Sequence, residues 1–201
     1  LEREPNNRQI LQKLADLHES QSQREESATC NKLLAISHLE EGDLAQAEGH
    51  LRKSLALSPK DIVTWQKLWD VVKRLGARDK ILAFGNEFTN HFRELGLMEI
   101  VRGHLLEMVK LFTADLRLKV ELADAEFALG NQKASVQGLF EVARFLISKR
   151  RFDRVAEVWG PYASARGYRF TPVRGGYQYA PGIGKGPTMN GTVEGIAIEI
   201  T

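Results

Sequence analysis

Histidine is the side chain best suited to hold a metal ion or to move a proton near neutral pH, and this 201-residue chain has five of them. No two stand in a His-x3-His spacing, and the single cysteine excludes a Cys-x2-Cys pair, so local spacing supports no metal site. His18 and His38 fall on apolar helical stripes, which favours a half-buried packing role. We therefore predict no metal. The five histidines are His18, His38, His50, His91 and His104.

Other patterns typical of catalysis are missing as well. The acidic pairs Glu40-Glu41 and Asp124/Glu126 are ordinary helix-surface charge, and no serine stands in a Gly-x-Ser-x-Gly elbow. The stretch GIGKGPT near the carboxyl end lacks the Gly-x4-Gly-Lys-Ser/Thr order of a phosphate loop. We predict no catalytic residue and no cofactor, and thus a protein that is not an enzyme.

The charge balance argues against nucleic acid as a partner. The formal net charge is +2, with 43% hydrophobic and 27% charged residues, which is typical of a globular chain. Nucleic-acid binders usually show a strongly basic face. The basic stretch KRRFDR at 149–154 could contact phosphates, but a basic turn that complements the dipole of the preceding helix is the simpler interpretation.

The sequence suggests the cellular compartment of the protein only indirectly. Cys30 is the one cysteine and cannot form an internal disulfide, so we expect a small buried packing residue. No apolar run approaches the roughly 20 residues of a membrane-spanning helix. The chain begins with Leu1 and a charged stretch, which suggests that its natural start lies upstream. A cytoplasmic location is favoured, and a periplasmic one stays open.

The elements that must position these residues are helices. Apolar residues recur at spacings of three and four, and Gly-Asp, Ser-Pro and Gly-Asn breaks separate the stripes. Such short connections force consecutive helices to pack side by side and antiparallel. About nine helices are predicted, namely 8–20, one ending at Gly42, 44–57, 63–75, 79–92, 98–112, 115–129, 132–148 and 152–165.

The chain also repeats itself. LADLHESQSQREES at 14–27 returns with changes as LADAEFALGNQKAS at 122–135, so Leu14, Ala15, Asp16 and Ser27 recur 108 positions later. The same offset aligns the apolar positions of three successive helices. A helix pair of this size cannot bury both of its faces alone, so repetition predicts a stack in which neighbours cover each other.

These patterns resemble the tetratricopeptide repeat (TPR) family, whose 34-residue helix-turn-helix unit has small contact residues and a proline near its end. The unit that follows residues 28–61 matches at Trp65, six residues after Pro59, and at Leu68 and Gly76. Ser54 replaces a usual alanine, and residues 77–112 match less well, which suggests an irregular pair. Residues 28–61 match at Gly42, Asp43, Ala47, Leu51, Leu55 and Pro59, and the third match is Leu122, Ala123, Gly130 and Asn131.

The resemblance implies an all-α, TPR-like antiparallel helical-repeat superhelix over residues 1–165, with a short irregular or β extension over 166–201. It also implies a concave groove, lined by the first helix of each pair, that holds a peptide or helix of another protein. Ile36 and Asp70 stand where a carboxylate-clamp repeat has asparagines, and core packing or a solvated face is the alternative for each position. The groove candidates are Lys32, Ile36, Leu39, Gln66, Asp70, Lys73, Arg74, Val120, Asp124 and Phe127.

The extension is rich in glycine, proline and tyrosine, and its alternation at Ile196, Ile198 and Ile200 predicts a short strand. NGTVEGIAIEI resembles the Asp/Asn-x-Ser-x2-Gly strand motif of PilZ domains, which implies a cyclic di-GMP site. Threonine replaces the serine, and the upstream arginines depart from the family's Arg-x3-Arg spacing. The alternative is a strand-and-loop extension that caps the last helix or pairs with the edge of a partner's sheet. The nucleotide-site candidates are Arg166, Arg169, Arg174, Asn190, Thr192 and Gly195.

The sequence therefore favours a non-catalytic protein–protein interaction scaffold that binds a partner segment in a repeat groove within a larger assembly. The alternative function is a cyclic di-GMP-responsive, PilZ-like module coupled to the repeats.

Overall fold

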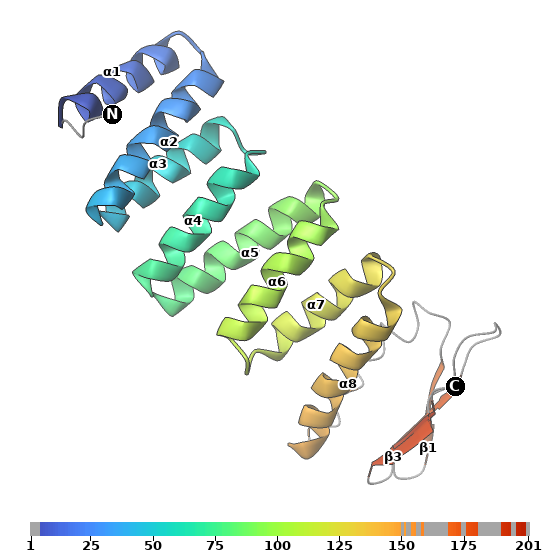
Figure 1. Ribbon diagram of the computed structural model, residues 1–201. Coiled ribbons are helices and arrows are strands. Elements are labelled where there is room, and N and C mark those ends of the chain that lie inside the picture. The colour runs from blue at the N-terminus through green and yellow to red at the C-terminus, as the bar shows by residue number, and fades with distance from the viewer. Residues whose placement is uncertain are drawn as a thin grey trace. The chain divides into compact units, whose positions relative to one another are not determined.

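The computed structural model of the chain describes residues 5–149, 151, 154–155 and 158, and the backbone of 169–173, 176–180, 190–193 and 196–199. It divides into two compact units, Leu1–Leu97 and Met98–Thr201. Each unit is built from consecutive helices that pack antiparallel to their neighbours (Figure 1).

The first unit contains five helices joined by short turns. They are α1 (Pro5–Ser20), α2 (Arg24–Glu41), α3 (Leu44–Leu57), α4 (Ile62–Leu75) and α5 (Arg78–Glu94). Each helix packs against the next one along the chain.

Local residues explain where these helices begin and end. The Asp43 carboxylate accepts a hydrogen bond from the backbone N–H of Gln46 and so caps the start of α3, and Asp61 accepts from Val63 and Thr64 at the start of α4. Gly42 ends α2 with φ +80°, and Gly76 ends α4 with φ +75°, a left-handed conformation that a side chain disfavours. The turns are therefore encoded one by one.

Small residues bring the first three helices together. Ser27 on α2 donates its hydroxyl hydrogen bond to the carbonyl oxygen of Ala15 on α1 at 3.1 Å, and Ser54 on α3 donates to that of Ala28 on α2 at 3.0 Å. All four residues are buried. The serine that replaces a usual TPR alanine at position 54 thus satisfies its own hydroxyl against a neighbouring helix, as buried polar groups require.

Aromatic side chains fill the space between α4 and α5. Trp65 on α4 stacks on Phe84 at 5.5 Å and on His91 at 4.9 Å between ring centroids, and meets Phe88 and Phe92 edge-on. Its indole N–H donates to the carbonyl oxygen of Pro59 at 2.8 Å, so the ring is fixed at both ends. This cluster gives the hairpin a bulky, fully packed interior.

The second unit contains α6 (Met98–Leu111), α7 (Leu116–Ala128) and α8 (Gln132–Ser148), followed by β1 (Arg169–Val173), β2 (Gly176–Ala180), β3 (Asn190–Val193) and β4 (Ile196–Glu199). The strands form one sheet in the order β1-β2-β4-β3. β1 pairs antiparallel with β2, β4 pairs antiparallel with β3, and β2 and β4 run parallel.

The predicted fold class, an all-α repeat of consecutive antiparallel helices, is confirmed by the described helices, and the described strands lie within the predicted irregular or β extension. The predicted helix over 132–148 has the observed bounds, whereas α2 begins at Arg24, earlier than its apolar stripe indicated, because Ser27 and Asn31 are buried polar residues. Of the predicted last helix over 152–165, Arg154, Val155 and Val158 are helical and the rest lies outside the described residues. The predicted boundary at 165/166 lies outside them too, and stays a prediction.

Candidate binding surfaces

One side of α4 presents a row of exposed side chains. Val63, Gln66, Asp70 and Arg74 are all exposed, and their spacings of three, four and four place them on one side of the helix. Val63 is 52% exposed although it is apolar. Trp65 and the other buried residues of α4 occupy the opposite side. We call Val63, Gln66, Asp70 and Arg74 the α4 stripe.

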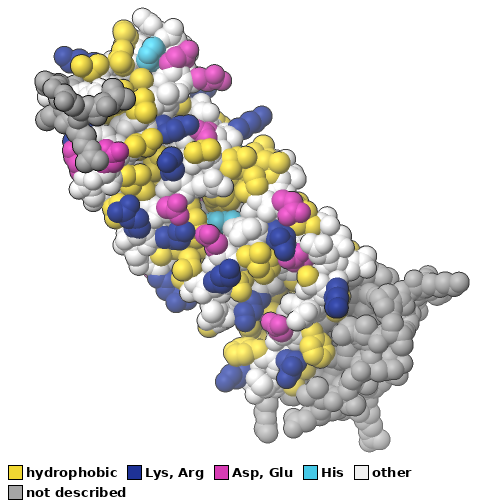
Figure 2. Space-filling model, viewed as in Figure 1, with side chains coloured by type: hydrophobic (Ala, Val, Ile, Leu, Met, Phe, Trp, Pro, Cys, Tyr) yellow, Lys and Arg dark blue, Asp and Glu magenta, His cyan; other side chains and the backbone are white. Residues whose placement is uncertain are grey.

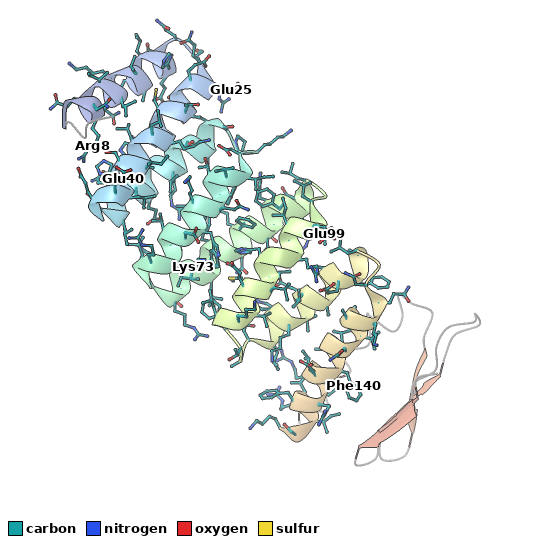
Figure 3. All side chains as sticks on the ribbon, in the orientation of Figure 1. Arg8, Glu25, Glu40, Lys73, Glu99 and Phe140 are labelled. Atoms are coloured by element: carbon teal, nitrogen blue, oxygen red, sulfur yellow. The ribbon has the colours of Figure 1, made fainter. Side chains whose placement is uncertain are left out.

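Lys73 lies beside the α4 stripe, but its ammonium group already contacts other residues of α4. Its ammonium nitrogen is 2.8 Å from the Asp70 carboxylate and 5.4 Å from the centroid of the Trp69 ring. Lys73 stands in the last turn of α4, where its positive charge is favourable (Figure 3). Of the predicted pair Lys73 and Arg74, the exposed Arg74 is therefore the better candidate for a partner's charge.

The groove candidates on α2 mainly support the α4 stripe and do not extend it. Lys32 is half-buried and forms an ion pair with Asp61, the residue that caps α4. Burial alone would raise the pKa of the Asp61 carboxyl, but hydrogen bonds from Lys32 and Thr64 outweigh it and lower that pKa. Ile36 and Leu39 are half-buried. Lys32 thus ties α2 to the start of α4.

The three candidates on α7 do not share one environment. Val120 packs against the α8 core cluster that contains Val142 and Ile147. Asp124 is exposed, and Phe127 is 39% exposed. Val120 therefore has the packing role that was the alternative interpretation, while the other two stay accessible.

A pocket that the sequence did not reveal lies on a different side of α7. It measures about 230 Å³. The pocket has space at its base because Ala123, Ala134 and Gly138 are small residues. This small-residue pattern was the one signal in the sequence, and it is equally typical of close helix packing. The lining residues are Val109, Thr113, Lys119, Leu122, Ala123, Glu126, Ala134, Gly138 and Glu141.

Glu126, in the wall of this pocket, is a buried charged residue of α7. One carboxylate oxygen accepts from Arg102 Nε at 2.7 Å, and the other accepts from the Asn131 side chain at 2.7 Å. The hydrogen bond to Glu126 and the negative charge of that carboxylate raise the pKa of the Arg102 guanidinium. Because both oxygens have partners, we assign Glu126 to joining α6, α7 and the start of α8.

The histidines pack rather than assemble a reactive group. His38 and His50 stack with ring centroids 5.4 Å apart, and His50 Nδ1 lies 3.1 Å from the side-chain oxygen of Asn31. His91 stacks on Trp65. Within the described part of the chain, no three His, Cys, Asp or Glu side chains gather into a metal-binding group. Cys30 is buried, as its packing role predicts.

The nucleotide-site candidates are only partly visible. Arg169 stands on β1, and Asn190 and Thr192 stand on β3, at opposite ends of the strand order. Arg166, Arg174 and Gly195 lie outside the described residues. In the basic stretch at 149–154, the ammonium of Lys149 lies 5.7 Å from the Phe145 ring centroid just after α8. None of the described helices is both long and apolar enough to cross a membrane.

Comparison with known proteins finds solved structures at low identity and low TM-score. No protein-family model and no curated protein sequence matches the chain. Similar solved structures include a putative kinesin light chain with nearly identical TPR-like repeats from Podosopora anserina, at 15% identity over 78% of each chain and a TM-score of 0.37. A tetratricopeptide repeat protein from Parabacteroides merdae has 14% identity over 80% of this chain and 79% of its own, with a TM-score of 0.29. MamA from Desulfovibrio magneticus has 12% identity over 79% and 94%, with a TM-score of 0.26.

Proposed function

We propose that this protein is a non-catalytic scaffold that holds a segment of another protein on the α2–α4 side of its first unit. The α4 stripe carries this proposal. It sets an apolar side chain, an amide, a carboxylate and a guanidinium in a row on one exposed helix side. Such a mixture of apolar and polar contacts is typical of protein-binding surfaces.

The support behind the stripe favours this role. α4 is backed by the Trp65 aromatic cluster, and its first turn is fixed by Asp61 and Lys32. A helix held in this way loses little conformational freedom when a partner binds, so more of the contact energy appears as affinity.

The chemistry of this side also restricts the partner segment. Asp70 is acidic and Ile36 is apolar, so neither would attract a free carboxylate. We propose an internal segment of the partner, with an apolar residue against Val63 and an acidic residue near Arg74.

The extension offers a second contact of a different kind. Among the described strands, β1 and β3 each have one neighbour in the sheet. An unpaired strand edge can accept a strand from another protein, so we propose edge pairing as an additional mode of attachment.

Affinity capture from the native source with matched variants tests the main proposal. The double variant Val63→Asp, Arg74→Glu changes the stripe, and Ala83→Asp, Lys80→Glu makes the same charge change at exposed positions of α5. We expect the stripe variant to lose a captured protein by about tenfold or more, as for central contact residues. The α5 variant should retain that protein. Equal retention by both variants would refute the proposed site.

A further inference from the structure

The pocket on α7, the α7 pocket, keeps space that helix packing does not require. Gly138 stands in the interior of α8, where glycine is less favourable than alanine because of its conformational freedom. A Cβ atom at Gly138 would lie 3.6 Å from the Cβ atom of Ala123, which is an ordinary contact distance, so close packing of α7 and α8 does not demand a glycine. What the glycine preserves is the volume of about 230 Å³ beside it.

The chain that follows α8 packs on another side of α7. Val155 joins the α8 core cluster, and Val158 packs against that cluster together with Leu116 and Val120 of α7. None of these residues lines the α7 pocket. The described residues after α8 therefore leave the pocket open.

Two opposite charges stand at one end of the α7 pocket. Lys119 on α7 is half-buried, and Glu141 on α8 is exposed. Positions 119 and 141 are each 11 residues from Gly130 in the turn, so in this antiparallel pair of helices they lie at the same level. Within the described part of the chain, neither side chain has a hydrogen-bond or ion-pair partner. An occupant would thus meet one ammonium and one carboxylate that are both available.

The volume of the pocket limits the size of that occupant. About 230 Å³ is less than the roughly 300–1,000 Å³ of pockets that enclose drug-sized molecules, and it suits a single large side chain. Side chains that anchor protein interfaces in such pockets are mostly tryptophan, tyrosine and arginine. An arginine would bring a second positive charge beside Lys119, and the aliphatic walls, which include Val109 and Leu122, favour an apolar body.

We propose that the α7 pocket binds a tryptophan side chain of a partner protein. The face of an indole attracts a cation more strongly than other aromatic rings do, which suits Lys119. The indole N–H can only donate, and the Glu141 carboxylate is an acceptor at the same end of the pocket. The body of the ring would fill the space beside Gly138. This site lies in the second unit and does not depend on the α4 stripe.

A titration with N-acetyl-tryptophanamide, a tryptophan side chain on a blocked backbone, tests this site in the full chain. The amide signals of α7 and α8 are followed by two-dimensional NMR to obtain the dissociation constant. Gly138→Leu fills the pocket. Gly103→Leu is the matched control, because Gly103 is an exposed glycine of α6 with open space at its Cβ position. Ala134→Leu blocks the pocket from an exposed position and decides the point if Gly138→Leu disturbs packing.

The probe should shift these signals in the wild type and in Gly103→Leu, and both blocking variants should weaken its binding by about tenfold or more. Lys119→Met keeps the aliphatic stem and should weaken binding by about threefold through the lost cation–π contact. N-acetyl-leucinamide should bind the wild type more weakly than the tryptophan probe. The absence of shifts in the wild type, equal binding by the blocking and control variants, or equal binding of the two probes would overturn the proposal.

Discussion

Asp61 performs two tasks at the start of α4. Its carboxylate accepts hydrogen bonds from the backbone N–H groups of Val63 and Thr64, and it also holds the ammonium of Lys32 on α2. The hydrogen bonds cap the start of α4, and the ion pair links α4 to α2. The residue therefore sets the position of the α4 stripe without belonging to it.

Replacing Asp61 with alanine should lower the free energy of unfolding by about 1–2 kcal/mol, chiefly through the lost cap. Asp70→Ala removes an exposed carboxylate of the same helix that is not a cap, and should change it by less than about 0.5 kcal/mol. Urea unfolding of the two variants measures the difference. Similar losses in both would contradict the capping role.

His50 makes stability depend on pH. Burial lowers its pKa below the ordinary value of 6.5, and the charges of His38 and Lys53 act in the same direction. The folded state then binds this proton less readily than the unfolded state, so stability rises with pH until the ordinary pKa is passed. It falls as pH drops from 6.5 towards the lower folded pKa.

We therefore expect the melting temperature of the wild type to fall more between pH 7.5 and 5.5 than that of His50→Gln. Thermal melts of both proteins across this range decide the point. Parallel pH profiles would show that the His50 imidazole does not resist protonation in the folded state.

Residue roles that depend on partners far away in the chain could not be predicted from the sequence. Lys32 fits a groove position by its place in the repeat, but its partner Asp61 lies 29 positions away and belongs to another helix. Val63 was missed because an apolar residue in a first turn looks like core. The α7 pocket was missed because α6, α7 and α8 contribute its walls jointly.

At the scale of elements, α4 and α5 form one tightly packed hairpin because Trp65 contacts rings from four residues of α5. Trp65→Ala should lower the free energy of unfolding by about 3–5 kcal/mol, as large truncations in a core do. Trp65→Phe keeps a ring and should cost clearly less. Urea unfolding compares the two, and equal effects would contradict the packing role.

Most helix ends could be predicted because their signals are local. Glycine in the left-handed region and aspartate caps act within one turn, as at Gly42 and Asp61. The start of α2 could not be predicted, because Ser27 and Asn31 are polar by type and buried only by their neighbours. The hydrogen bond from Ser27 to Ala15 exists only once α1 and α2 have packed, whereas that from Asn31 to Ser27 lies within α2.

At the scale of the whole molecule, charges of both signs alternate over the face in Figure 2. This agrees with the net charge of +2 and with a face that has no strong electrostatic field of one sign. The 108-residue repeat predicted that two hairpins would be alike.

The strand order bears on the cyclic dinucleotide hypothesis. Arg169 on β1 and Asn190 on β3 are separated by three inter-strand spacings, about 14 Å in all. We expect no heat when cyclic di-GMP is titrated into the wild type by calorimetry. Heat that disappears in Arg169→Ala, Arg174→Ala would restore that hypothesis.

The central claim, that the α4 stripe contacts a partner, is tested most directly by photo-crosslinking. A photoreactive amino acid placed at Gln66 should capture one defined protein in the native source, and the same group at Ala83 on α5 should not. Arg74→Glu in the Gln66 protein should abolish the capture. Capture of the same protein from both positions, or of none from Gln66, would contradict the account.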